Sequence, residues 1–201
     1  MRSTPAHDPG GPPRVDNPEL AELARVPWTL RVGAKPFLVR PGTVRDLSAV
    51  ARMHAACSPR SLLDRYRCGG RPPAVAALEN SLRQPFNYVV AAPDGAVVAH
   101  AVLRRDPRHN HFCAEIGLLV TDRWQRLGIG TELTTHLAGV AHVTGFHELI
   151  GYPATAVPRA QRLMIGVGRT RMVPDGEAHL HTYLSESATL GLGSVRQRLA
   201  G

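Results

Sequence analysis

The spacing of hydrophobic residues predicts that the chain between positions 43 and 83 is mainly helical. From Val44 to about residue 56, apolar residues recur every three or four positions, which predicts an amphipathic helix with Thr43 as its N-cap. Ser58 followed by Pro59 is typical of a second helix start, because serine caps the first turn and proline fits the first helical position. The segment 73–83 has the spacing of a third helix.

Further along, the period of the pattern changes from that of helices to that of strands. The runs 86–92 and 96–104 are joined by Pro93-Asp94-Gly95, which predicts a β-hairpin. The remaining expected elements are strands at 37–40, 113–120, 148–152, 169–173 and 179–184, and helices at 131–143 and 157–167. This order of strands, hairpin and helices predicts an α/β sandwich around a mixed sheet.

Composition narrows the class of protein. The chain has 201 residues, of which 43% are hydrophobic and 20% are charged, as in ordinary globular domains. No apolar run reaches the roughly 20 residues of a membrane span, and the N-terminus lacks the apolar core of a signal peptide. The three cysteines are odd in number and irregularly spaced, which argues against a disulfide framework. We therefore expect a reduced, cytoplasmic protein without a membrane partner.

The formal net charge is +8, and Lys35 is the only lysine among the cationic residues. Such a charge suits an anionic partner, for example nucleic acid, a membrane surface or a phosphorylated cofactor. The preference for arginine is also what codon bias alone produces. Aromatic residues are only 5% of the chain and the arginines are spread along it, which argues against a nucleic-acid surface.

The segment with the most informative chemistry is 114–130, a strand followed by a glycine loop that opens a helix. Backbone N–H groups at a helix start form an anion site, and glycine lets a ligand approach the backbone closely. The loop lacks the Gly-Lys-Ser/Thr of a Walker A motif and the third glycine of a dinucleotide fingerprint. Taken alone, two glycines at a helix start describe a structural turn equally well.

In this context, Gln125-Arg126-Leu127-Gly128-Ile129-Gly130 resembles the Gln/Arg-x-x-Gly-x-Gly/Ala motif of the GCN5-related N-acetyltransferases, the GNAT family. The resemblance implies a three-layer α/β sandwich with a central mixed, mostly antiparallel sheet over 36–184. A flexible extension (1–35) would precede it and a tail (185–201) would follow. It also implies acetyl-CoA as co-substrate, with pyrophosphate on the loop amides and pantetheine along the strand. The residues it assigns to acetyl-CoA are Leu118, Leu119, Val120, Gln125, Arg126, Leu127, Gly128, Ile129, Gly130 and Thr131.

Glu115 is the candidate catalytic residue. A carboxylate inside an apolar strand is costly to bury unless it is paired or functional, and alternation places Glu115 on one face with Gly117. Beside an apolar pocket it would have a raised pKa, suited to deprotonating an attacking amine. The resemblance to protein-acetylating GNAT members implies this role, whereas an ion pair with Arg104 is the alternative. Gly117 is expected to mark a bulge that splays the strand and makes the cofactor slot.

The acceptor is less well defined. The segment Ser58–Tyr66 resembles a helix of bacterial protein lysine acetyltransferases, although an amphipathic helix with Leu62 and Tyr66 on the core explains it equally well. The asparagine and tyrosine that the family often carries near the last long helix are missing from 155–164, and Tyr152 lies off that pattern. No general acid is therefore assigned.

The expected function is transfer of acetyl from acetyl-CoA to a primary amine by direct attack, with a protein lysine favoured over a small amine. The alternative is a non-catalytic acyl-CoA-binding sensor, and a homodimer is left open. Two groups, His109-x-His111-x-Cys113 and His179-x-His181, have metal-ligand side chains, but neither supplies a four-ligand zinc set, so no metal is expected.

Overall fold

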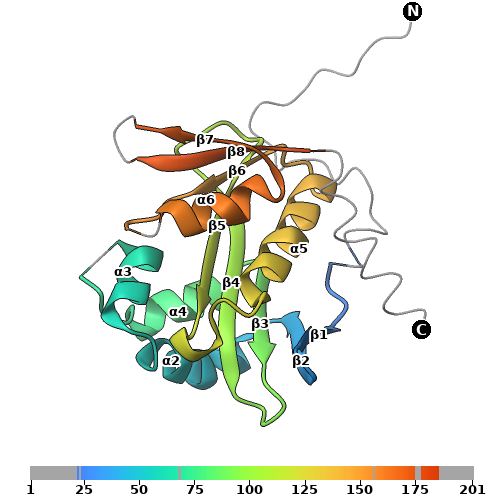
Figure 1. Cartoon of the computed structure of the whole chain (residues 1–201), viewed down its shortest axis with the longest axis vertical. Coiled ribbons are helices and arrows are strands. Elements are labelled where there is room, and N and C mark those ends of the chain that lie inside the picture. The colour runs from blue at the N-terminus through green and yellow to red at the C-terminus, as the bar shows by residue number, and fades with distance from the viewer. Residues whose placement is uncertain (1–21, 23, 68, 156, 175–177, 186–201) are drawn as a thin grey trace, which may run out of the picture.

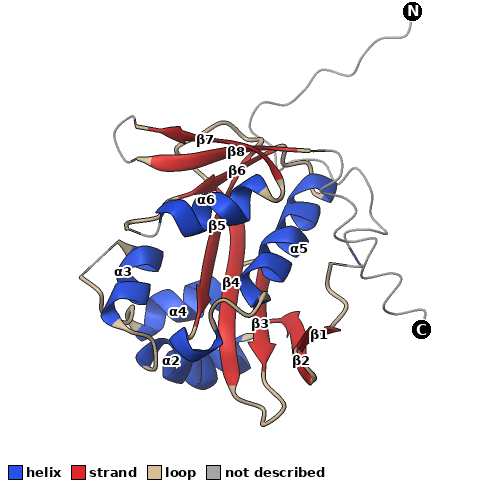
Figure 2. Cartoon of the chain, in the orientation of Figure 1, coloured by secondary structure: helices blue, strands red, loops and turns tan. Residues whose placement is uncertain are grey.

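One eight-stranded sheet organises the chain in the computed structural model, which describes residues 22, 24–67, 69–155, 157–174 and 178–185 (Figure 2). Its strand order is β1-β2-β3-β4-β5-β6-β8-β7, and every neighbouring pair is antiparallel except β5 and β6. The strands are β1 (Trp28–Val32), β2 (Lys35–Pro41), β3 (Phe86–Ala91), β4 (Val97–Arg105), β5 (Cys113–Val120), β6 (Glu148–Gly151), β7 (Gly168–Val173) and β8 (His179–Leu184). The expected mixed, mostly antiparallel sheet is confirmed.

Helices cover both faces of the sheet and complete three layers (Figure 1). They are α2 (Leu47–Ala55), α3 (Pro59–Tyr66), α4 (Val75–Leu82), α5 (Ile129–Val143) and α6 (Val157–Ile165), with short 3-10 turns at η1 (Val44–Asp46) and η2 (Asp122–Trp124). Leu133 and Leu137 of α5 pack on one face with Ala99 of β4. Leu62 of α3 packs on the other face with Val89 of β3. Because successive strand residues point to opposite faces, β3 and β4 contribute to both cores.

The local signals read from the sequence place most of the helices correctly. The Ser58 hydroxyl accepts a hydrogen bond from the Ser61 N–H, and Pro59 occupies the first position of α3. The helix α5 begins at Ile129 rather than at Thr131, because Gly128 adopts a left-handed conformation (φ +89°) that ends the loop directly before it. None of the described helices is long and apolar enough to cross a membrane.

The sheet begins before residue 36, where the start of the domain was expected. Strand β1 pairs along its whole length with β2, and it buries Trp28, Leu30 and Val32 against the core shared with α5. Part of the region assigned to a flexible extension is therefore the edge of the sheet. Most of the extension, residues 1–21, and most of the tail, residues 186–201, lie outside the described residues.

Candidate active site

The sheet opens between β5 and β6. These two parallel strands pair only through Cys113, Ala114 and Glu115, opposite Glu148, Leu149 and Ile150. Beyond this point β5 continues to Val120 while β6 ends at Gly151. In the described part of the chain no strand pairs with residues 116–120 of β5 on this side.

The backbone groups at the opening can be assigned from the ladder on the other side of β5. Thr121 donates its N–H to the Val98 carbonyl, and the Cys113 carbonyl accepts from the Asp106 N–H. The backbone N–H and C=O groups of the odd-numbered residues of β5 therefore point toward β4. Because these groups alternate along a strand, those of Leu118 and Val120 point toward the open side. The Val120 carbonyl on that side accepts a hydrogen bond from the Gln125 side chain.

The glycine loop brings a helix N-terminus to the same opening. Arg126 (φ +64°) and Gly128 (φ +89°) turn the chain into α5, and the Glu132 N–H makes the first helical bond, to the Gly128 carbonyl. The amides of Ile129, Gly130 and Thr131 precede that bond, so they have no acceptor within the helix. Together with the dipole of the 15-residue helix, these amides are suited to binding an anion.

The side chains of the predicted cofactor residues have different surroundings. Leu119 and Ile129 are buried in opposite cores, whereas Arg126, Leu127 and Gly128 are exposed. The space beside Gly130 is bordered by Leu118, since a Cβ added there would lie 3.5 Å from Leu118 Cδ2.

Gln125 braces the loop through its side-chain amide. Its Nε2 donates to Ser61 Oγ at 3.0 Å and to the Val120 carbonyl at 2.9 Å, while its Oε1 accepts from Arg159 Nη1 at 2.6 Å. The amide thus connects the loop to α3, β5 and α6.

Glu115 lies where β5 and β6 separate, and it forms the ion pair that the sequence left as an alternative. Arg104 donates to Oε2 of Glu115 from Nε at 3.1 Å and from Nη2 at 2.7 Å. The guanidinium of Arg108 lies 3.7 Å from the same oxygen. The surroundings are therefore not the apolar pocket that was expected. These contacts with Arg104 and Arg108 are made through Oε2.

Gly117 does not mark a bulge toward β4. The pairing of β4 with β5 runs from Arg105 and Ala114 to Ala99 and Val120 without a change of register. Instead, the missing side chain makes room for the guanidinium of Arg65 on α3, with which any Cβ at this position would collide. The opening of the sheet arises on the opposite edge of β5, where β6 ends.

A second polar group lies close to Glu115 and was not foreseen. The buried carboxylate of Asp106 accepts from the Tyr152 hydroxyl at 2.6 Å and from the Arg108 backbone N–H at 2.9 Å. Burial tends to raise the pKa of Asp106, but hydrogen bonds from Tyr152 and Arg108 outweigh it and leave that pKa lowered. Burial and the neighbouring Asp106 raise the pKa of Tyr152. The Tyr152 hydroxyl proton is therefore directed at Asp106.

A cleft of about 410 Å³ adjoins this group. The Arg108 guanidinium lies over the Tyr152 ring at 4.0 Å from its centroid and forms part of the wall. The full lining is Arg108, His109, Tyr152, Arg171, Val173, His179 and His181. No sequence pattern predicted this cleft, because its residues come from β7, β8, the loop before β5 and the position directly after β6, and they meet only in the folded chain.

An open strand edge that leads to a helix N-terminus defines a class of α/β protein suited to an extended ligand with an anionic group. A model of the acetyltransferase (GNAT) family matches residues 59–164, more than half of the chain. The chain belongs to this family.

Solved structures share the fold. The GNAT domain of S. lividans PAT has a TM-score of 0.69 and 18% identity, over 79% of this chain and 97% of that one. A phosphinothricin acetyltransferase (Pat) from Sinorhizobium meliloti, in complex with AcCoA, has a TM-score of 0.57 and 20% identity, over 74% and 88%. A cAMP-binding acyltransferase from Mycobacterium smegmatis has a TM-score of 0.54 and 20% identity, over 90% and 57%. A search of curated proteins gave no significant match.

Proposed function

We propose that this protein is an acetyl-CoA-dependent N-acetyltransferase that acts on a primary amine by direct attack in a ternary complex. The observation that carries the proposal is the open edge of β5, which leads to the amides at the start of α5. The pantetheine arm would pair with the backbone of Leu118 and Val120, and the pyrophosphate would bind the amides of Ile129, Gly130 and Thr131. The AcCoA complex of the similarly folded S. meliloti enzyme supports this choice of co-substrate.

Glu115 would act as the base at the point where the strands separate. The amine nitrogen attacks the thioester carbon and forms the C–N bond, the C–S bond breaks, and coenzyme A leaves as its thiolate. The amine proton passes to Oε1 of Glu115, directly or through one water, while Arg104 holds the carboxylate through Oε2. The Leu118 N–H would polarise the thioester carbonyl.

For the acceptor, a protein lysine is favoured over a small amine. Helix α3, whose sequence resembles that of bacterial protein lysine acetyltransferases, packs on the Glu115 face of β5. Its Arg65 guanidinium reaches Gly117, two residues from Glu115 on that face. An acceptor that approaches Glu115 from this side would therefore contact α3.

Acetyl-CoA binding tests the proposal and can be measured by titration calorimetry of the full chain. Gly128→Glu places a carboxylate beside the pyrophosphate site, and we expect saturable micromolar binding to be lost. Gly95→Glu is a matched control, because Gly95 also has a positive φ (+81°) and open space around it but lies in the β3–β4 hairpin. No binding to the wild type at millimolar acetyl-CoA, or equal binding by both variants, would contradict the cofactor site.

The alternative is a non-catalytic acyl-CoA-binding sensor. The lack of an assigned general acid, with Tyr152 hydrogen bonded to Asp106, favours it. A sensor would bind acetyl-CoA but release no coenzyme A in the presence of lysine-containing peptides or small amines.

A further inference from the structure

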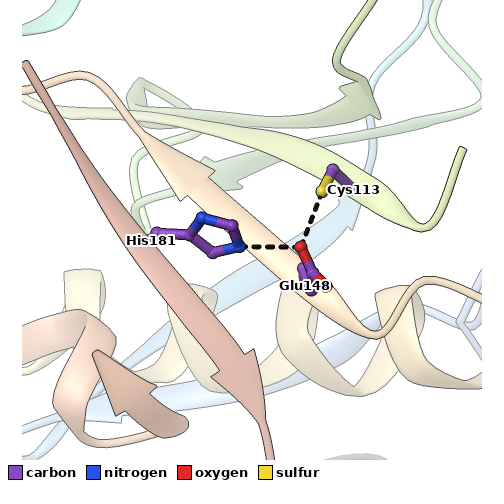
Figure 3. Close-up of side chains that lie close together, drawn as sticks. All are labelled: Cys113, Glu148 and His181. Atoms are coloured by element: carbon purple, nitrogen blue, oxygen red, sulfur yellow. Dashed lines mark hydrogen bonds and ion pairs between the residues drawn. The ribbon is translucent and has the colours of Figure 1, made fainter. Parts of the chain in front are cut away.

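Cys113, Glu148 and His181 form a compact cluster of three different metal-ligand side chains (Figure 3). The Cys113 thiol donates to Glu148 Oε2 at 2.9 Å, and His181 Nε2 lies 2.7 Å from the same oxygen. The sulfur, nitrogen and oxygen atoms all lie within 4.8 Å of one another. Cys113 and His181 are buried and Glu148 is partly buried, so the cluster is not a solvated surface group.

The fold assembles this cluster from three adjacent strands. Cys113 begins β5 opposite Glu148 of β6, and His181 of β8 lies opposite Ile150, on the same face as Glu148 by alternation. Neither of the two histidine-containing motifs in the sequence has four ligands. The cluster takes one residue from each motif and adds Glu148, which no sequence pattern indicated.

The arrangement of the three side chains does not suit a cysteine nucleophile. Such a cysteine needs a base in contact with its thiol, normally a histidine. Here His181 and Cys113 both contact the Glu148 carboxylate. Both contacts instead meet at one oxygen, Glu148 Oε2, which brings a sulfur, a nitrogen and an oxygen ligand atom together.

Thiolate, imidazole and carboxylate together suit a borderline divalent cation such as Zn²⁺, which binds these ligands at about 2.0–2.3 Å. In a tetrahedral shell the donor atoms lie about 3.3–3.7 Å apart, so side-chain shifts of less than about 1 Å would open the cluster to the ion. His181 also lines the cleft of about 410 Å³, which leaves room for a water as the fourth ligand. Three protein ligands and one open position form the pattern of accessible zinc sites.

We propose that Cys113, Glu148 and His181 form a binding site for Zn²⁺ or a similar divalent cation, with water as the fourth ligand. Binding replaces the proton of the Cys113 thiol, which is released to solvent, and forms the metal–sulfur bond. The ion joins β5, β6 and β8 next to the three-residue pairing of β5 with β6, and it lies two residues along β5 from Glu115.

The test is a zinc titration of the metal-free full chain against a chromophoric chelator, with Co²⁺ as a spectroscopic probe. We expect one ion per chain, a thiolate-to-cobalt charge-transfer band, and a melting temperature that rises by ~5 °C or more at a large excess over Kd. Cys113→Ser should abolish the charge-transfer band, and His181→Gln and Glu148→Gln should each weaken binding by ~10-fold or more. Cys57→Ser, which removes a buried thiol elsewhere, is the matched control.

Circular dichroism of each metal-free variant separates loss of the site from loss of the fold. If Cys113→Ser does not fold, the His181→Gln and Glu148→Gln variants still decide the question. Absence of stoichiometric binding to the wild type overturns the proposal. Binding that is equally strong in the folded variants overturns it as well, because the ion would then lie elsewhere.

Discussion

At the scale of single residues, Glu115 is constrained by its neighbours on β4. Arg104 is directly opposite Glu115 in the antiparallel ladder, and both of its hydrogen bonds go to Oε2. The pair fixes the carboxylate at the site where the strands diverge. In the proposed mechanism, Oε1 accepts the amine proton while Oε2 keeps its hydrogen bonds to Arg104.

Glu115→Gln tests this role directly. We expect kcat to fall by ~10²-fold or more, because the amide cannot accept the amine proton, while acetyl-CoA affinity changes little. Steady-state kinetics with an amine acceptor and calorimetry with acetyl-CoA measure the two effects separately. Glu79→Gln, at an exposed ion pair on α4, should leave both unchanged. A Glu115→Gln enzyme with the wild-type rate would exclude Glu115 as the base.

At the scale of elements, the two sides of β5 should respond differently to the cofactor. The N–H groups of Leu118 and Val120 point toward the opening, whereas the N–H group of Leu119 points toward β4, where Leu119 pairs with His100. Acetyl-CoA pairing with the open edge should slow amide exchange at Leu118 and Val120 by ~10-fold or more and leave Leu119 unchanged. Hydrogen exchange followed by NMR, with and without acetyl-CoA, resolves these neighbours. Equal protection of all three would indicate general stabilisation instead of strand pairing.

Asp122, at the start of η2 just before the glycine loop, binds helix α3 through its side chain. Its carboxylate accepts from the Ser58 N–H at 2.8 Å, from Ser58 Oγ at 2.7 Å and from Ser61 Oγ at 2.8 Å. Burial tends to raise the pKa of Asp122, but these hydrogen bonds prevail and lower it. The folded state therefore holds the carboxylate ionised to a lower pH than the unfolded chain does. Its contribution to stability is fully present above about pH 4 and is lost as pH falls through the lowered value.

Asp122→Ala should accordingly lower the free energy of unfolding by about 1 kcal/mol at pH 7, because it removes hydrogen bonds from Ser58 and Ser61 at an exposed, solvent-screened position. The difference from the wild type should shrink below about pH 4, where the wild-type carboxylate becomes protonated. Urea unfolding at several pH values measures both effects. Glu79→Ala, which removes an exposed pair with Arg83, should cost less than about 0.5 kcal/mol. A penalty for Asp122→Ala that is constant down to pH 2 would contradict this account.

Local signals explain which elements could be predicted from the sequence. Ser58 and Pro59 at a helix start, the Pro93-Asp94-Gly95 turn and the glycine loop each act within a few residues, and the structure has the elements they predicted. The long-range contacts had no such signal. The groups around Asp106 and Glu148 join residues 33 to 46 positions apart, and only the pairing of β5, β6 and β8 brings them together.

At the scale of the whole molecule, the sheet consists of two parts that meet at a weak junction. Strands β1–β5 form one antiparallel set with helices on both faces, and β6, β8 and β7 form a second antiparallel set. Only three residue pairs join β5 to β6. The proposed cofactor slot, Glu115 and the proposed metal site all lie along this junction. The core on the α5 face spans both parts, because it contains Ala99 of β4 as well as Leu149 of β6 and Leu180 of β8.

Substitutions in β1, the edge strand of the first part, test whether β1 unfolds together with the rest of that part. Trp28 of β1 is buried, with its ring centroid 4.1 Å from that of His136 on α5, whereas the adjacent Thr29 is exposed. Because β1 belongs to the folded domain, Trp28→Ala should lower the free energy of unfolding by ~3–5 kcal/mol. Thr29→Ala, one position along the same strand, should change it by less than about 0.5 kcal/mol. Denaturant unfolding of the full chain compares the two. If both variants matched the wild type, β1 would lie outside the cooperative unit, which would support the boundary expected at residue 36.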